Sequence, residues 1–211
     1  QPLRIECGDL QPWSQPLVDD RAGDGEPAHP AVEDADGGVG AGGADVRDRR
    51  AQVDVGHNQI SPKFRGDDRV TIVEGVNARY LTPKNLAGIL HREYVPNLVV
   101  ADLSFISLTH VIGALVATAS ADADFVLLIK PQFEVGRTGV KEGIVTNPAL
   151  REDAINTVLW NAWDAGLETV NIISSPILGG AGNHEYVVWL RAHGGDNPSQ
   201  WRDTVHKLAG G

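Results

Sequence analysis

Polar residues that can bind ligands or transfer protons stand at the ends of successive apolar runs in this sequence. Asp102 closes the run "LVVAD" and Lys130 closes "FVLLIK", while Asp54 and Asn77 follow two shorter β-like runs. A lysine is rarely buried unless it is paired, and a partly desolvated ammonium group can polarise a hydroxyl group. A carboxylate at Asp102 can orient that cation. One at Asp54 can accept both hydroxyls of a ribose, with Asn77 near an adenine edge.

Each of these side chains also has a purely structural interpretation. Asp102 could cap a helix, Lys130 could reach along the surface to water, and Glu185, in "GNHEYVVWL", could be an exposed hairpin carboxylate. Two features favour a functional role. Pro131 fixes the backbone direction directly after Lys130, and polar residues at four strand ends in a row are harder to explain by packing than any one alone.

The apolar pattern around these residues predicts an α/β fold. Strands that alternate with helices indicate a doubly wound, Rossmann-like parallel sheet, whose ligands bind beyond the carboxyl ends of the strands. The close spacing of the last two strands around "GGAGN" predicts a hairpin, and hence one antiparallel strand at the C-terminal end. The expected strands are 53–56, 69–76, 97–106, 124–130, 167–177 and 184–192, and the expected helices are 107–118 and 147–166.

The composition of the chain changes near residue 52. Residues 1–52 carry eleven acids and five bases, so −6 of the net charge of −10 lies there, and from 21 to 52 the large aliphatic residues are Val32, Val39 and Val46 alone. Such a segment buries too little apolar surface to offset its conformational entropy. We expect residues 1–52 to be disordered or the product of a disrupted reading frame, 53–193 to form the core, and 194–211 to form a C-terminal helix or tail.

Several classes of protein are disfavoured by the bulk properties. The single cysteine, Cys7, excludes an internal disulfide and favours a cytoplasmic protein. No apolar run approaches a membrane span, and no His or Cys pair has the spacing of a metal site. The acidic balance argues against binding to nucleic acid by charge alone. Oligomeric state is left open by the sequence.

Four blocks in this order closely resemble the TlyA family: "VVADLSFISL", "LLIKPQFEVGR", "EGIVTNPALR" and "SSPILGGAGNHEYVVWL". These are FtsJ-like methyltransferases, also known as haemolysins, and the likeness runs from about Val53 to Leu190. The resemblance implies S-adenosylmethionine as cofactor and the 2′-hydroxyl of a cytidine in ribosomal RNA as substrate, with ribosomal subunits as partners. By motif match, Asp102, Lys130 and Glu185 are the last three members of a catalytic Lys-Asp-Lys-Glu set.

The same resemblance assigns cofactor contacts to Asp54, Asn77 and Asp102. Gly37 and Gly38 stand 17 and 16 residues before Asp54, the spacing expected for the family's cofactor-binding glycine pair. The strand and helix that should flank this pair are not recognisable, and "GVGAGG" at 38–43 matches a dinucleotide fingerprint by letters only. We therefore expect the first strand and the cofactor loop to be degraded or missing.

The first lysine of the catalytic set has no counterpart, because no lysine precedes Lys63, and no S4-type RNA-binding domain is recognisable. Two interpretations follow: a ribose methyltransferase, or a non-catalytic remnant of the family that binds RNA or a ribosomal partner. The haemolysin name also suggests a membrane-active protein, but this sequence contains no basic amphipathic helix that would bind a membrane. A generic nucleotide-binding or oxidoreductase domain would explain the strand ends but not "KPQFEVGR" or "GNHEY".

Overall fold

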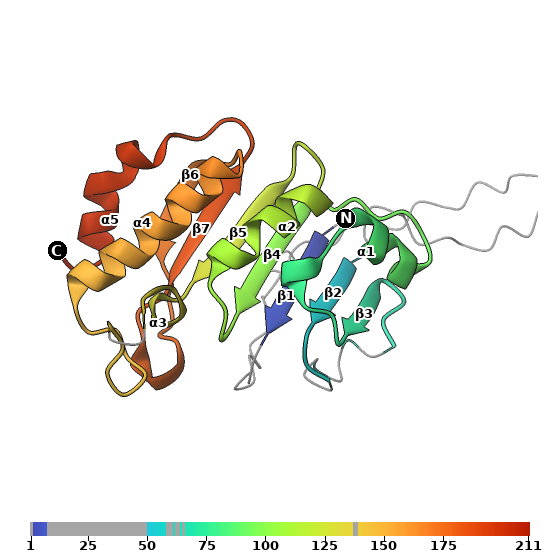
Figure 1. Ribbon diagram of the computed structural model, residues 1–211, viewed down its shortest axis with the longest axis horizontal. Helices are drawn as coiled ribbons and strands as arrows, with labels where there is room; N and C mark the ends of the chain where they lie inside the picture. Colours follow the sequence, from blue (N-terminus) through green and yellow to red (C-terminus); the bar gives the residue numbers. More distant parts are fainter. Residues whose placement is uncertain (1, 8–49, 58–60, 62–63, 65, 137–138) are drawn as a thin grey trace, which may run out of the picture.

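The protein is organised around one seven-stranded sheet with the order β3-β2-β1-β4-β5-β7-β6 (Figure 1). A computed structural model describes residues 2–7, 50–57, 61, 64, 66–136 and 139–211. The strands are β1 (Pro2–Cys7), β2 (Arg50–Asp54), β3 (Val70–Glu74), β4 (Leu98–Leu103), β5 (Asp124–Ile129), β6 (Glu168–Ser174) and β7 (Tyr186–Arg191). Neighbours from β3 to β5 pair in parallel, and β7 is inserted antiparallel between β5 and β6. The expected parallel sheet with a C-terminal antiparallel strand is therefore confirmed.

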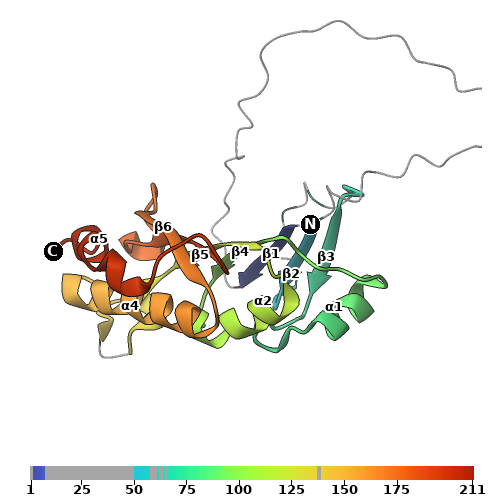
Figure 2. The same ribbon diagram turned by 90° about the horizontal axis from the view of Figure 1, so that it is seen from above.

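Three helices lie side by side along one face of this sheet (Figure 2). They are α1 (Pro83–Leu90), α2 (Ile112–Thr118) and α4 (Pro148–Asp164), which connect the strands from β3 to β6. A short helix, α3 (Pro131–Glu134), directly follows β5, and α5 (Arg202–Leu208) packs against α4 near the C-terminus. Four 3₁₀ turns complete the described elements: η3 (Ala78–Tyr80), η4 (Leu108–His110), η6 (Gly180–Gly182) and η7 (Pro198–Trp201).

Helix α4 forms where its sequence signals predict it. The Asn147 side chain accepts a hydrogen bond from the Ala149 backbone N–H at 3.0 Å, and Pro148 occupies the first helical position. Ile155, Val158 and Leu159 recur at helical spacing and are fully buried against the sheet. The helix expected at 107–118 is instead divided into η4 and α2, with Ser107 capping η4.

The expectation of a missing first strand is corrected by the structure. Residues Pro2–Cys7 form β1 at the centre of the sheet, with Ile5 in register with Val53 of β2 and Ala101 of β4. The next strand also begins before the expected core boundary at 53, at Arg50. A run of only six residues gives little indication of a strand from its own sequence. Partner strands on both sides supply the pairing that this local pattern does not reveal. The stretch between these two strands, including Gly37 and Gly38, lies outside the described residues.

The core lies between the sheet and the helical layer. Residues of β4 and β5 alternate between buried and half-buried, so that Val99, Ala101, Phe125, Leu127 and Ile129 face the helices. This alternation fixes the register, because a one-residue slip would turn the buried set outward. No helix of the described chain is long and apolar enough to cross a bilayer.

Candidate functional site

The site is centred on an ion pair at the carboxyl edge of two neighbouring strands. Lys130 follows the last residue of β5, and its Nζ lies 2.6 Å from Oδ1 of Asp102 on β4. The two side chains are 12% and 18% exposed, so the pair is largely withdrawn from water. The ammonium group also donates to Ser104 Oγ at 3.2 Å. A half-buried cation held from two sides is fixed in direction, as stabilisation of a developing negative charge requires.

Glu185 joins this pair from the opposite side of β5. It lies directly before β7, which the antiparallel pairing places beside β5, and it is almost completely buried. Gln132 Nε2 of α3 donates to Glu185 Oε1 at 3.1 Å. Burial raises the pKa of Glu185, while the Lys130 charge and the Gln132 hydrogen bond lower it and the Asp102 charge raises it. The structure thus brings together the three side chains to which the sequence assigned catalysis.

Gly179 leaves room for the Glu185 carboxylate because it has no side chain. A Cβ atom built on Gly179 would lie 2.0 Å from Oε1 and 2.3 Å from Cδ of Glu185. Both distances are far below van der Waals contact, so any other residue at 179 would displace the carboxylate or the turn that carries it. The neighbouring Gly180 has no such constraint, because its Cβ would meet nothing within 4 Å.

A cavity of about 680 Å³ opens beside the ion pair at the carboxyl ends of β2, β3 and β4. Its walls combine apolar side chains with a few polar groups, which is typical of small-molecule sites. Ser104 and Gln132 line it and also contact Lys130 and Glu185, so the cavity reaches the ion pair. The apolar part of the lining includes Val55, Val76, Leu103, Ile106 and Phe133.

Asp54 ends β2, directly before Val55 in the cavity wall. Its Oδ1 accepts a hydrogen bond from the Gly56 backbone N–H at 2.7 Å, whereas Oδ2 is buried and has no hydrogen-bond partner among the described residues. Burial raises the pKa of Asp54; the Gly56 bond and His57 lower it, and Glu74 raises it. An orphaned carboxylate oxygen at a strand end can accept from a sugar hydroxyl.

Asn77 follows β3 and lines the cavity, as its predicted place at a strand end requires. Its Oδ1 accepts a hydrogen bond from the Arg79 backbone N–H at 3.0 Å and caps η3. The side-chain NH₂ group remains a donor that could meet the edge of a purine. Its cofactor role stays a prediction, as does that of Gly37 and Gly38. In the described part of the chain no cluster of metal-ligating side chains occurs.

Two aromatic residues at the site were not singled out from the sequence. Phe105, in the loop after β4, is 75% exposed and has a φ of 64°, a left-handed conformation that is costly for a bulky side chain. Its ring lies 5.3 Å from that of Phe133 on α3, with an interplanar angle of 51°. Both residues line the cavity. The signal available in the sequence was their position, each three residues after Asp102 or Lys130.

Glu134 ties the loop of Phe105 to α3. Its Oε1 accepts from the Leu108 backbone N–H at 2.9 Å, and its Oε2 accepts from the Ser107 hydroxyl. Burial raises the pKa of Glu134, and these two hydrogen bonds lower it. Glu134 therefore links α3 to the loop after β4, and its hydrogen bonds go to that loop and not to the ion pair.

Comparison with known proteins agrees with this geometry. A family model described as FtsJ-like methyltransferase matches residues 49–192, more than half of the chain. The chain belongs to the FtsJ-like methyltransferase family. Its described strands β2 to β7 and the three converging side chains all lie within or at the limits of the matched range.

Individual relatives cover the same part of the chain. The 16S/23S rRNA (cytidine-2′-O)-methyltransferase TlyA of Mycobacterium tuberculosis is 47% identical over 139 residues, which is 65% of this chain and 50% of the relative. Hemolysin A of Brachyspira hyodysenteriae is 38% identical over 64% of this chain and 55% of its own length. The chain thus spans about half the length of the curated relatives it matches. The TlyA family resemblance seen in the four sequence blocks is confirmed.

Solved structures of similar sequence share the fold. A protein described as a hemolysin from Streptococcus thermophilus superimposes with a TM-score of 0.69 at 34% identity, over 77% of this chain and 57% of that one. Another, from Lactococcus lactis, gives a TM-score of 0.66 at 32% identity, over 74% of this chain and 76% of that one. The Rossmann-like α/β fold expected from the strand pattern is confirmed.

Proposed function

We propose that this chain carries the methyl-transfer site of an RNA ribose 2′-O-methyltransferase that acts on a cytidine of ribosomal RNA with S-adenosylmethionine. The observation that carries the proposal is the 2.6 Å Lys130–Asp102 ion pair with Glu185 beside it, next to a cavity of about 680 Å³. The name of the M. tuberculosis relative supports the choice of substrate.

The chemistry requires a weak nucleophile to attack a methyl group on a sulfonium. Bound S-adenosylmethionine supplies a methyl group that is already activated, so the protein must mainly align the hydroxyl group and stabilise its charge. Lys130, held in place by Asp102 and Ser104, stabilises negative charge on the ribose oxygen. Glu185, whose pKa is raised by burial, accepts the proton that the hydroxyl group loses. The C–S bond breaks as the C–O bond forms.

The described residues fit the adenosyl part of the cofactor. Asp54 offers a carboxylate oxygen to the ribose hydroxyls, Asn77 offers an amide to the adenine, and Val55 and Val76 supply apolar surface in the cavity. A ring that enters from the RNA side would lie against Phe105, since aromatic side chains stack on unpaired bases. Within these 211 residues, RNA would be held by such local contacts, because the net charge of −10 does not attract phosphates.

Two measurements on the purified chain test the proposal. The first is calorimetric titration with S-adenosylmethionine, for which we expect saturable binding that Asp54→Asn weakens. The second is transfer of a radiolabelled methyl group to ribosomal subunits and to protein-free ribosomal RNA, with the product located by its resistance to alkaline cleavage at the 2′ position. Cofactor binding and transfer together support the enzyme.

The alternative interpretation predicts a different pair of results. A non-catalytic remnant would be a cooperatively folded core that binds RNA or a ribosomal partner but neither binds the cofactor nor transfers a methyl group. The observation that favours it is the sequence around Gly37 and Gly38, where the strand and helix that should flank a cofactor loop are not recognisable. Absence of cofactor binding in a folded sample would overturn the enzyme in favour of this remnant.

A further inference from the structure

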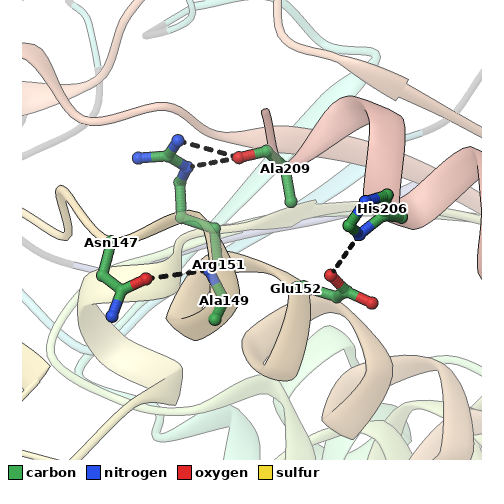
Figure 3. Close-up of polar contacts among 6 residues, drawn as sticks. All are labelled: Asn147, Ala149, Arg151, Glu152, His206 and Ala209. Atoms are coloured by element: carbon green, nitrogen blue, oxygen red, sulfur yellow. Dashed lines mark hydrogen bonds and ion pairs between the residues drawn. The ribbon is translucent and has the colours of Figure 1, made fainter. Parts of the chain in front are cut away.

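The loop that follows α3 is connected to the C-terminal helix by a single arginine. The side chain of Arg151, in the first turn of α4, donates four hydrogen bonds to backbone carbonyls of the described residues. Its Nη1 donates to Val145 O at 3.0 Å and Thr146 O at 2.9 Å. Its Nε and Nη2 donate to Ala209 O at 3.1 and 2.8 Å, at the end of α5 (Figure 3).

This use of an arginine is unusual because no carboxylate of the described residues pairs with it. None of the ion pairs between described residues includes Arg151. A guanidinium group has five donors in a rigid planar fork, so it can hold two chain segments at a fixed separation. Ala209 is also the C-cap of α5, where a cation complements the helix dipole. Arg151 therefore fastens the loop at 145–146 to the C-terminal helix.

The same loop is fastened on its other side to the turn that carries Glu185. The Val145 backbone N–H donates to Asn183 Oδ1 at 3.1 Å, and Asn183 Nδ2 donates to Gly143 O at 2.8 Å and to Gly180 O at 3.0 Å. Asn183 is 2% exposed, so these bonds are shielded from competition by water. Asn183 precedes Glu185 by two residues.

The charge of Arg151 also acts at the start of β7. Tyr186, the residue after Glu185, is fully buried. Burial raises the pKa of the Tyr186 phenol, and the nearby charge of Arg151 acts against that rise. The guanidinium group therefore lies close to the start of β7 as well as to the loop.

We infer that Arg151 and Asn183 are positioning residues, which set the place of Glu185 relative to Lys130 by linking α5, the loop at 143–146 and the turn at 179–183. The inference rests on the proposed function, because Glu185 acts chemically only in that reaction. It gives a role to two sequence blocks, "EGIVTNPALR" and "GGAGNHEY", that the three catalytic side chains leave largely unexplained. It also makes the C-terminal helix part of the active-site support.

Hydrogen–deuterium exchange tests this inference without any need for activity. In Arg151→Met we expect the backbone amides of residues 179–185 to exchange about tenfold faster, as loss of one or two hydrogen bonds allows, while peptides from β4 and β5 stay unchanged. His206→Gln is the matched control. It removes the 2.8 Å His206–Glu152 contact between the same two helices but leaves the Arg151 bonds intact (Figure 3).

An NMR titration of the Glu185 carboxyl group measures its pKa, which a general loosening of α5 would not change. In Arg151→Met the pKa of Glu185 should fall toward its ordinary value as the carboxylate gains access to water. Asn183→Ala should have the same effect, since it removes the acceptor for Val145 and the donor to Gly143 and Gly180 without adding a charge near Glu185. Arg151→Lys should restore only part of the wild-type behaviour, because an ammonium group cannot span both segments.

The outcomes separate this inference from the proposed function. Faster exchange confined to residues 145–147 and 202–211, with the Glu185 titration unchanged, would overturn the positioning role. If Arg151→Met does not fold, the Arg151→Lys and Asn183→Ala variants decide the question by the same two readouts. A wild-type chain that transfers no methyl group but shows the predicted exchange pattern would overturn the proposed activity and keep the structural link.

Discussion

Asp54 and Asp102 stand at the same level of the sheet, two strands apart. Both are paired in register with Glu6 of the central strand, Asp54 through β2 and Asp102 through β4. With a spacing of about 4.8 Å between neighbouring strands, their backbones lie roughly 10 Å from each other. This separation suits a ligand whose ribose meets one carboxylate while its reactive group meets the other. The short strand at residues 2–7 therefore sets the distance between Asp54 and the Lys130–Asp102 ion pair, the two parts of the proposed site.

Replacement of Lys130 by methionine should abolish methyl transfer and leave the fold in place. The side chain keeps its length but loses the charge that stabilises the ribose oxygen, which should lower the transfer rate by at least about 100-fold. Asp102 would remain half-buried without its partner, so the thermal midpoint should fall. Transfer assays, melting curves and cofactor titration measure the three effects, with the exposed Lys141 changed to methionine as control. Wild-type rates in Lys130→Met would refute its assignment.

Gly179 and Gly180 offer an unusually clean comparison of two neighbouring positions. Gly179→Ala places a Cβ 2.0 Å from Glu185 Oε1, whereas Gly180→Ala meets nothing within 4 Å. We expect the first change to displace the Glu185 carboxylate from Gln132 and to reduce the transfer rate by about tenfold or more, and the second to be nearly neutral. Single-turnover rates with the cofactor saturating give the comparison. Equal losses in the two variants would show that the turn, and not the carboxylate, is what alanine disturbs.

Part of this site follows from the sequence because of simple strand geometry. Asp102 and Lys130 end neighbouring parallel strands, so their meeting at one edge could be predicted from the order of the runs. The bond from Gln132 to Glu185 could not, because it depends on β7 being inserted between β5 and β6. The central strand escaped prediction for a related reason. Its pairing partners lie far away in the chain, and local propensity carries no information about them.

Asp54→Asn should weaken cofactor binding and at the same time stabilise the protein without cofactor. Burial raises the pKa of Asp54, so the folded state binds its proton more readily than the unfolded chain does. The stability that this protonation contributes is present at low pH and is lost as pH rises through the raised pKa. An asparagine has no charge to bury, so its advantage in thermal midpoint should be largest at neutral pH and should vanish in acid.

The same change, Asp54→Asn, should lower the affinity for the cofactor although it raises the thermal midpoint. Loss of a charged acceptor for the ribose hydroxyls should raise the dissociation constant of S-adenosylmethionine by about tenfold or more. Calorimetry and melting curves between pH 4 and pH 8 measure both effects, with the exposed Asp122→Asn as a control for a general loss of negative charge. A lower midpoint for Asp54→Asn at neutral pH would mean that the carboxylate has a partner that stabilises it in the folded state.

Phe105 should matter for RNA and not for the fold. It is 75% exposed in a left-handed backbone conformation, so Phe105→Gly removes the ring and relieves the strain in one step. We expect an unchanged or higher thermal midpoint together with weaker binding of the RNA substrate, since stacking on one base is worth about 1–3 kcal/mol. Phe105→Trp keeps a stacking surface and should retain most of the affinity.

The control for this prediction is another exposed apolar residue at the opposite edge of the sheet. Val95 precedes β4 at its amino end, so Val95→Ala should leave both stability and RNA binding unchanged. Gel-shift titration with a short RNA that contains the target cytidine in a loop measures the affinity, and a transfer assay at saturating RNA separates binding from catalysis. If Phe105→Gly binds this RNA as tightly as the wild-type chain does, the ring does not stack on the substrate. Its strained backbone would then have to be explained by the contact with Phe133 alone.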